Sequence, residues 1–440
     1  MSETSTTIEL HAGEQVPPKQ GGLTGSIPFS WIFEGGSAVL DQAIFSGSHF
    51  VVSLLLARWM PTGEYGLYAL AYSVLLFFLA IHSALLGEPM TVYGAARYRE
   101  RFGDYLRGVL RAHWLLTLLG SVTLALTGYL LDSRYQHLRW ALWGVGLALP
   151  GVLLLWLVRR ARYARLQPSR AVLMSTTYSA LLIALLVSLL HFGLLSTFTT
   201  LAAMTASALA VCSINFSSLG GKTERSAPVP FANVILDHWK YGSWAVIASG
   251  ATWLTFNIYF LVLPAAHGLG AAANLRALTN LVTPCLQAFV GIAMMLVPFF
   301  ARRKQTYGPA RMVKDLQKIL LLLLAAGLLY AGLIWIFRDA LFSFLYAGRY
   351  GKDAGLAFFL LLLLPFAGTF ALVVGAGLRA MERPDLVFAA YAGAAGAVFL
   401  FGIPLAQSRG IVGAGAGLLL SETVAGGLCV LFLFGLRRKS

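Results

Sequence analysis

The feature that most constrains this chain is a series of apolar runs, each about 20 residues long, that recurs over nearly its whole length. A helix of that length can cross the hydrocarbon core of a bilayer, which is roughly 30 Å thick. Of the 440 residues, 58% are hydrophobic and only 12% are charged, whereas soluble domains carry about a quarter charged residues. The sequence therefore predicts an all-α polytopic membrane protein.

Twelve apolar runs can be placed along the chain. We expect transmembrane helices at roughly 35–57, 65–87, 108–131, 139–158, 171–190, 194–216, 240–263, 271–300, 316–337, 355–378, 386–405 and 411–435. A connection rich in Ser, Gly and Pro lies at the midpoint, with six spans on each side, and is the natural boundary between two lobes. The predicted organisation is a cytoplasmic tail (1–26), an N-lobe (27–216), a cytoplasmic linker (217–237) and a C-lobe (238–440).

The net charge of +15 is explained by membrane topology. With the N-terminus inside, cytoplasmic segments hold about three quarters of the 33 Lys and Arg residues, which follows the positive-inside rule. Both termini are thus predicted to be cytoplasmic. The basic excess indicates attraction to anionic membrane lipids and not a nucleic-acid partner. The first 26 residues lack a basic segment followed by an apolar one, so we expect no signal peptide.

The eighth span carries the most informative polar pattern. Arg276, Asn280, Thr283 and Gln287 are spaced by 4, 3 and 4 residues and so share one helical face. Lipid would not tolerate such a face, so we expect it to point into the bundle or a hydrated cavity. There Arg276 would hold an anionic group such as a phosphate, for which its planar fork of donors is suited. The alternative is that Arg276 anchors the outer end of its helix.

The first two spans contribute further candidates. Asp41 lies deep enough in the first span to carry a proton or pair with a cation, or else to hydrogen-bond another helix. Glu34 lies seven residues earlier on the same face, nearer to the interface, and is a second candidate for ion coupling. Tyr68 and Tyr72 share a face of the second span, where they would either pack or stack against sugar rings.

The sequence shows no His, Cys and carboxylate cluster with metal-ligand spacing, no phosphate-binding Gly loop and no serine elbow motif. The three cysteines all fall in apolar spans, where they are expected to act as small apolar fillers. We therefore predict no catalytic residue, no metal and no cofactor, apart from coupling to H⁺ or Na⁺, and no enzymatic activity.

Two stretches carry a resemblance to a known family. The first is LLLARWMPTGEYGLYALAYSVL (54–75) and the second, more loosely, is GEPMTVYGAAR (87–97). They resemble the opening of Wzx-type oligosaccharide flippases, members of the multidrug/oligosaccharidyl-lipid/polysaccharide flippase superfamily. In that family a span ending in Ala-Arg is followed by a short Pro- and Gly-containing loop and a Gly-x-Tyr-Ala run. One departure is that Gly270 is followed by three alanines, where the family often has Gly-x-Tyr.

The resemblance implies about 12 transmembrane helices in two six-helix lobes around a central cavity that opens alternately to each side. It further implies a bacterial inner-membrane protein that moves an undecaprenyl-pyrophosphate-linked oligosaccharide from the cytoplasmic to the periplasmic leaflet. A polysaccharide polymerase and an export machinery are the implied protein partners.

Two other functions remain open at this point. The first is a multidrug exporter of the same fold, in which Asp41 would bind the coupling ion; a predominantly acidic cavity would favour it. The second is a membrane polysaccharide polymerase or ligase. Such enzymes usually need a sizeable outward loop with catalytic Arg or His residues, and the outward segments of this chain are short.

Overall fold

The computed structural model describes residues 29–216, 229–351 and 354–437, in which all regular structure is helical. The predicted tail and most of the predicted linker lie outside these residues. The helices are α1 (Phe29–Trp59), α2 (Thr62–His82), η1 (Ser83–Gly87), α3 (Glu88–Tyr93), α4 (Phe102–Leu130), η2 (Ser133–Tyr135), α5 (Gln136–Ala164), α6 (Pro168–His191), α7 (Thr197–Phe216), α8 (Phe231–Asn257), α9 (Tyr259–His267), α10 (Leu269–Ile336), α11 (Arg338–Tyr346), α12 (Gly355–Leu362), α13 (Leu364–Ala380), α14 (Pro384–Ala397), η3 (Val398–Gly402) and α15 (Ile403–Arg437).

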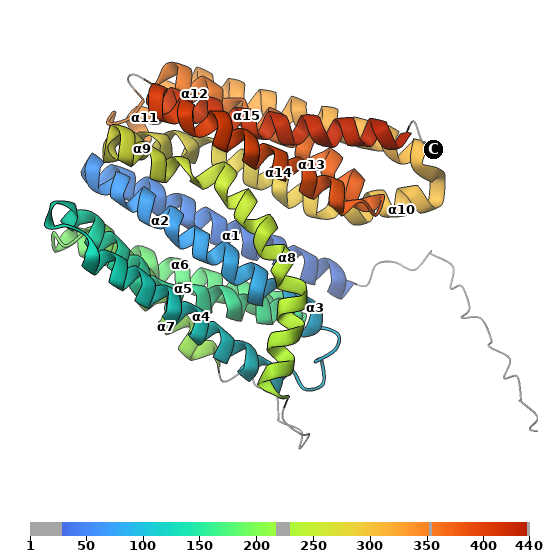
Figure 1. Ribbon diagram of the computed structural model, residues 1–440, viewed down its shortest axis with the longest axis horizontal. Helices are drawn as coiled ribbons and strands as arrows, with labels where there is room; N and C mark the ends of the chain where they lie inside the picture. Colours follow the sequence, from blue (N-terminus) through green and yellow to red (C-terminus); the bar gives the residue numbers. More distant parts are fainter. Residues whose placement is uncertain (1–28, 217–228, 352–353, 438–440) are drawn as a thin grey trace, which may run out of the picture.

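The predicted spans all have helical counterparts. Within the described ranges, ten continuous helical segments are long and apolar enough to cross a membrane. Two of them are interrupted by a glycine with non-helical backbone angles, Gly308 in α10 (φ 79°) and Gly410 in α15 (φ 57°). Glycine tolerates a positive φ because it has no Cβ. The chain reverses at Gly308, so α10 supplies both the eighth and the ninth predicted span (Figure 1). The fold is thus that of an all-α polytopic membrane protein.

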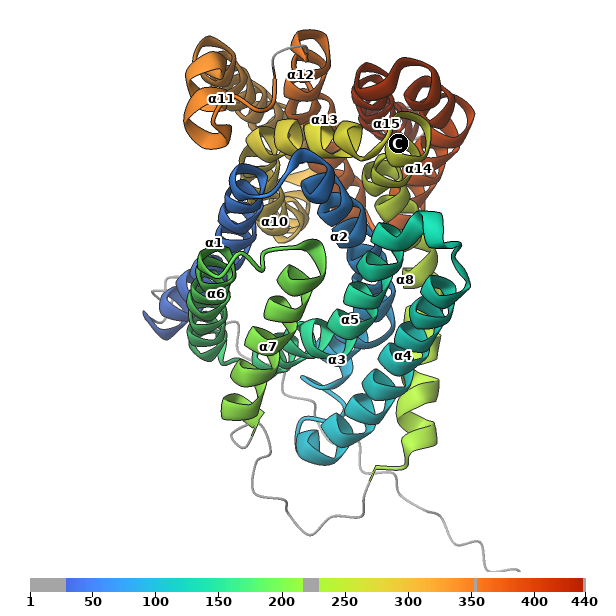
Figure 2. The same cartoon turned by 90° about the vertical axis from the view of Figure 1, so that its left-hand side faces the viewer.

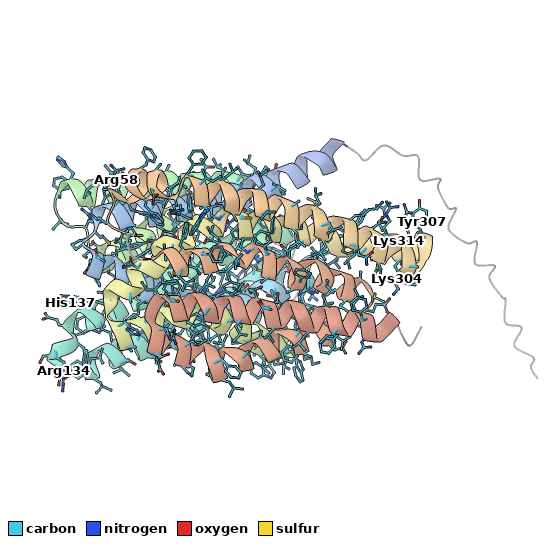
Figure 3. The ribbon with its side chains drawn as sticks, turned by 90° about the horizontal axis from the view of Figure 1, so that it is seen from above. Arg58, Arg134, His137, Lys304, Tyr307 and Lys314 are labelled. Carbon is cyan, nitrogen blue, oxygen red and sulfur yellow. The ribbon has the colours of Figure 1, made fainter. Side chains whose placement is uncertain are left out.

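The helices form two bundles. Helices α1 to α7 make up one, which we call the N-lobe, and helices α9 to α15 make up the other, the C-lobe (Figures 1 and 2). Helix α8 runs from the first bundle to the second. The two ends of the molecule are marked by different side chains: Arg58, Arg134 and His137 lie at one end, and Lys304 and Lys314 at the other (Figure 3). We call these the Arg58 end and the Lys304 end.

The lobes are packed together at the Arg58 end. Arg58 donates to the carbonyl of Phe344 at 3.0 Å, and Arg349 donates to the carbonyl of Met60 at 3.0 Å. One continuous cluster of buried apolar side chains extends from α1 and α2 through α10 to α11 and α12. A second cluster, which includes Phe300, belongs to the C-lobe alone. Interlobe hydrogen bonds between the described residues of α1 to α7 and α9 to α15 are confined to the half nearer the Arg58 end.

Helix α8 is held by the N-lobe along most of its length. The indole of Trp253 donates to the carbonyl of Ser73 at 2.9 Å, and His238 contacts the carbonyl of Leu85 at 2.9 Å. Gly242 allows a close approach, because a Cβ there would lie 2.9 Å from the carbonyl oxygen of Ala84. The following short helix, α9, packs instead on α10 and α15 of the C-lobe. The first span of the second half of the chain thus bridges the two bundles.

The second span continues beyond its expected end at residue 87. After α2 the helix widens into the π-helical turn η1, and α3 then continues to Tyr93 with Pro89 in its first turn. Proline lacks a backbone N–H, and it lies where the regular i→i−4 bonding is already interrupted, because the N–H of Glu88 bonds to the carbonyl of Ser83.

Candidate functional site

Two residues of the predicted polar stripe on α10, Arg276 and Asn280, face the other lobe. The guanidinium carbon of Arg276 lies 4.9 Å from the centre of the Tyr72 ring on α2 and 5.7 Å from that of Phe260. Arg276 is half-buried, and its Nε is shielded from solvent without a hydrogen-bond partner. A guanidinium stacked on aromatic rings keeps its in-plane N–H groups free to bind an anion.

Tyr72 is the last of three stacked tyrosines on α2. The ring centres of Tyr65 and Tyr68 are 6.2 Å apart, and those of Tyr68 and Tyr72 are 5.7 Å apart. Spacings of three and four residues place them on one helical face, as expected. Tyr68 is almost fully buried, so it packs between its neighbours, whereas Tyr72 is only half-buried beside Arg276.

Asn280 contacts the tyrosine stack at Tyr65, the member nearest the Arg58 end. Its amide Nδ2 donates to Ser53 Oγ at 3.0 Å and to the Tyr65 hydroxyl at 3.1 Å, which ties α1, α2 and α10 together. The two other residues of the stripe are not part of this network. The Thr283 hydroxyl donates to a carbonyl of its own helix, and Gln287 is exposed in the direction of the Lys304 end.

Asp41 is the centre of a buried network within the N-lobe. Its carboxylate accepts a hydrogen bond from Arg159 Nη2 on α5 at 2.7 Å, and from the hydroxyls of Tyr163 and Ser175. Asp41 is fully buried, and Arg159 is 4% exposed. A carboxylate with three donors has its charge compensated, so Asp41 makes the interhelical hydrogen bonds that the sequence left open as one alternative. The second candidate acid, Glu34, belongs to α1, but its side chain lies outside the described residues.

Aromatic side chains connect Arg159 to Arg276. The Arg159 guanidinium lies 3.8 Å from the centre of the Phe45 ring, and Phe45 packs against His49 with ring centres 4.8 Å apart. His49 Nδ1 is 3.5 Å from the Tyr72 hydroxyl, which is the ring beneath Arg276. We call these five residues the basic–aromatic strip. It runs from the N-lobe interior to the lobe interface, with a guanidinium at each end.

Sequence reasoning missed Arg159. The expected span 139–158 ends just before it, which places Arg159 in a cytoplasmic segment, yet it lies inside α5 with its charge turned into the bundle. The pattern around it did contain a signal. Trp156 and Tyr163 lie three residues before and four after it, on the same helical face, and that is the face that packs inward. An arginine between two aromatic residues on one helical face indicates an inward-facing position, whereas a run of basic residues alone is typical of a cytoplasmic loop.

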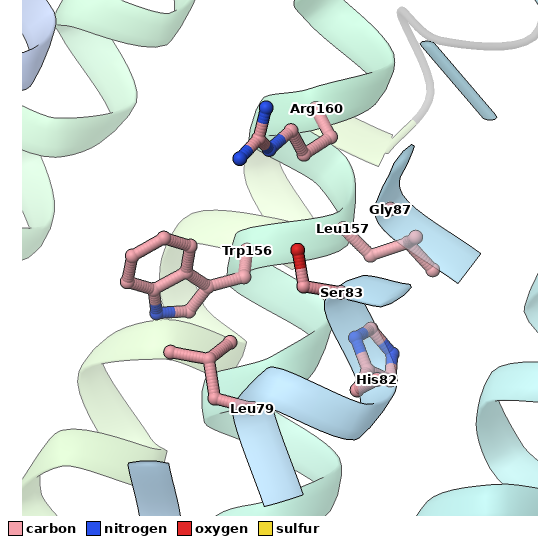
Figure 4. Close-up of a pocket in the computed structure, with 7 residues that line it drawn as sticks. All are labelled: Leu79, His82, Ser83, Gly87, Trp156, Leu157 and Arg160. Atoms are coloured by element: carbon pink, nitrogen blue, oxygen red, sulfur yellow. The ribbon is translucent and has the colours of Figure 1, made fainter. Parts of the chain in front are cut away.

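A small cavity lies beside the strip (Figure 4). Residues of α2, η1 and α5 line it, among them His82, Trp156 and Arg160, and it has room for about one water molecule. His82 Nε2 is 2.9 Å from Nδ1 of the equally buried His113. The cavity is far too small for a sugar.

Among the residues with described positions, no group of three or more His, Cys, Asp or Glu side chains could hold a metal ion. Cys212, Cys285 and Cys429 are buried and free, in keeping with their expected role as apolar fillers.

Several solved transporter structures share this fold. The solved structures most similar in shape include an inward-facing multidrug-resistance MATE family transporter of the MOP superfamily (TM-score 0.70, 14% identity, 91% of this chain and 98% of the other). They also include the eukaryotic MATE transporter AtDTX14 (TM-score 0.65, 15% identity, 92% and 95%). A third is a MOP superfamily transporter from Pyrococcus furiosus, described as having a binding pocket of reverse polarity (TM-score 0.59, 14% identity, 94% and 98%).

Among curated protein sequences there is no significant match. The family model for polysaccharide biosynthesis proteins, Polysacc_synt, matches residues 36–304. The match includes the stretch 54–75 on which the resemblance rests, and it confirms that resemblance. Because it extends over more than half of the chain, this protein belongs to the polysaccharide biosynthesis protein family, on the fold shared by MATE transporters.

Proposed function

We propose that this protein is a flippase that moves a polyprenyl-pyrophosphate-linked oligosaccharide from the cytoplasmic to the periplasmic leaflet of a bacterial inner membrane. The observation that carries the proposal is the position of Arg276. Its guanidinium comes from the C-lobe, lies over Tyr72 of the N-lobe, and has an unpartnered Nε. A group that touches both lobes and can bind an anion is what a carrier of a pyrophosphate-linked substrate requires.

The chemistry of the strip fits the three parts of such a substrate. The pyrophosphate would be bound by the fork of donors on Arg276, since guanidinium groups form paired hydrogen bonds with phosphate oxygens. The sugar would contact the exposed edge of Tyr72 on α2 and the amide of Gln287, which lies further along α10 than Arg276. The lipid tail would remain in the bilayer between the lobes.

The charge distribution supports the direction. By the positive-inside rule the Lys304 end is cytoplasmic and the Arg58 end periplasmic. The lobes are joined at the Arg58 end, so the described conformation is one that would receive a substrate from the cytoplasmic side. Alternating access would then require these contacts to break while new ones form at the Lys304 end. In this role the protein would act between the enzymes that build the oligosaccharide and a periplasmic polymerase with its export machinery.

A drug exporter is less well supported. Export of cationic drugs calls for uncompensated negative charge near the substrate, whereas Asp41 is already paired with Arg159 and both charged ends of the strip are cationic. The similarity to MATE transporters extends to the fold, and their substrates are not implied for this chain.

The test is a leaflet assay in proteoliposomes with a fluorescent polyprenyl-pyrophosphate oligosaccharide. Loss of charge-assisted hydrogen bonds costs about 1.5–3 kcal/mol each, so Arg276→Ala should slow translocation by at least about tenfold. Arg276→Lys keeps the charge but not the fork and should be intermediate. Arg134→Ala removes an exposed arginine at the Arg58 end and serves as the matched control. The proposal fails if the wild type does not move the probe but exports a cationic dye.

A further inference from the structure

The C-lobe contains an acidic side chain that the strip does not use. Glu422 lies in α15, within the apolar run that ends the chain, and is 6% exposed. Its Oε2 lies against α13, where a Cβ at position 368 would be only 2.9 Å away, so Gly368 leaves the room that this oxygen occupies.

The carboxyl group of Glu422 is buried, and it has no hydrogen bond and no ion pair with any described residue. The neighbouring packing cluster consists of Ala371, Ala394 and Ala425, with Tyr391 and Val424 at its edge. None of the three alanines can donate a hydrogen bond from its side chain. Glu422 and Asp41 thus lie in opposite surroundings, because Asp41 has three donors and Glu422 has none.

Among the described residues, few charged or titratable groups lie near Glu422. Tyr391 of α14 is its titratable neighbour, and Cys429 and Arg379 lie near Tyr391 in turn. Arg379 lies on α13, and no cation is within ion-pairing distance of Glu422 among the described residues. From α13 itself, the nearest contact to the carboxylate is Gly368, which has no side chain.

A lone carboxylate in such a place either takes up a proton or binds a metal cation. Among the described residues, no further acidic or histidine side chains gather around Glu422 to help it bind a metal ion. A proton needs only the carboxylate itself. We propose that Glu422 is a proton-binding site of the C-lobe and couples translocation to the transmembrane proton gradient.

The packing explains how one proton would act on a whole lobe. In the described conformation α13, α14 and α15 pack around Glu422 and leave only 6% of it exposed, which favours the neutral carboxylic acid. When the proton leaves to water, the carboxylate is left charged and needs hydration, which the packed arrangement does not allow. Loss of the proton would therefore favour a conformation in which these helices separate. The coupling rests on the proposed function, but the proton site itself does not.

The proton site can be tested without any substrate. Infrared spectroscopy of the purified protein in nanodiscs should show the C=O stretch of a buried carboxylic acid at neutral pH, and Glu422→Gln should remove it. Glu382→Gln, which changes an exposed acid of the C-lobe, should leave the band in place. Glutamine copies the neutral acid in shape, so Glu422→Gln should fold and melt like the wild type. A band that survives in Glu422→Gln would overturn the proposal.

The coupling is tested in the leaflet assay. An imposed proton gradient should accelerate translocation several-fold in the wild type and in Glu382→Gln, and should have no effect in Glu422→Gln. If the wild type does not translocate, the proposed function fails, while the infrared result still decides on the proton site. If Glu422→Gln responds to the gradient as the wild type does, the coupling role is wrong.

Discussion

At the scale of single residues, two buried charges of the N-lobe, those of Asp41 and Arg159, form an ion pair. The Arg159 and Asp41 pair is fully enclosed, and two hydroxyls complete the shell of the carboxylate. Such a pair gains little relative to apolar residues, because both ions lose their hydration. Removing one partner, however, leaves a buried charge without compensation. The pair therefore fixes how α1, α5 and α6 pack more than it adds to stability.

Removing one partner of the Asp41–Arg159 pair should therefore destabilise the protein. Arg159→Ala should lower the free energy of unfolding by about 3–5 kcal/mol. Arg134→Ala, in the exposed pair with Asp132, should cost at most about 1 kcal/mol. Unfolding in mixed micelles, followed by circular dichroism, measures both. A double change of Arg159→Ala with Asp41→Asn should be milder than the sum of the single changes, and strict additivity would contradict the pairing.

The sequence could predict some of this site and not the rest. The α10 stripe is visible because its residues repeat with the helical period, and Arg276 and Asn280 do face the other lobe. The partners of Asn280 could not be predicted, because Ser53 and Tyr65 are more than 200 positions away in the chain. Asp41 could be named as a buried acid, but its partner Arg159 could not, since one sequence does not reveal which helices are neighbours.

At the scale of helices, the connection at the Arg58 end includes two glycines near the beginnings of α2 and α10. Gly66 lies in the second turn of α2, so close to α10 that a Cβ would overlap the carbonyl oxygen of Leu269. Gly270 begins α10 and lies next to Thr62 of α2, with 3.9 Å between its Cβ position and the Thr62 methyl. The beginnings of the two helices therefore touch reciprocally, and the contact allows no side chain at position 66.

Gly66→Ala should weaken closure at the Arg58 end. A cysteine at Ser53, which is 1% exposed behind this contact, should react faster with a membrane-impermeant thiol reagent added from the periplasmic side. Gly63→Ala is the matched control, because a Cβ at position 63 would meet nothing within 4 Å. Equal labelling rates in the two variants would show that the contact does not hold the lobes together.

A second element-scale feature is the attachment of α8. Asp237, in its second turn, accepts hydrogen bonds from Arg97 at 2.8 Å and from the Tyr98 hydroxyl at 2.6 Å. Burial, followed by the bond to this carboxylate, raises the pKa of Tyr98 above its ordinary value. The hydroxyl thus remains a donor at neutral pH. Its contribution to stability is complete below the usual tyrosine pKa of about 10 and is lost only as the pH rises beyond it.

Tyr98→Phe removes this one donor and leaves the ring in place. It should cost about 1.5–3 kcal/mol locally, since the acceptor is charged, and should speed amide hydrogen exchange in the first turns of α8. Exchange in α6, which has no contact with this cluster, is the internal reference. Unchanged exchange in α8 would mean that Arg97 alone secures the helix.

At the scale of the whole molecule, the bilayer makes the architecture easy to predict and the details hard. Twelve spans follow from apolar length alone, because each must cross the same hydrocarbon thickness. The lobes follow from the family resemblance and from the polar connection between spans six and seven. The two glycine kinks that split α10 and α15 are not evident in an apolar run, and neither is the attachment of α8 to the N-lobe.

The contacts at the Arg58 end, with the orientation proposed above, give a prediction for accessibility. A cysteine at the exposed Gln287 should be labelled by an impermeant thiol reagent from the cytoplasmic side and protected from the periplasmic side. A cysteine at Gly63, in the exposed first turn of α2, should show the reverse pattern. Labelling of right-side-out and inverted vesicles distinguishes the two. Equal labelling of position 287 from both sides would rule out closure at the Arg58 end.

The bridging course of α8 has a mechanical consequence. Its Trp253 is fixed to one bundle, while the helix that follows at Tyr259 is packed into the other. The two bundles are thus linked by a helical segment and not only by loops. Ile258, between α8 and α9, keeps helical backbone angles, so the two helices form one continuous segment. If the bundles rock as proposed, this segment would carry the movement of one bundle directly to the other.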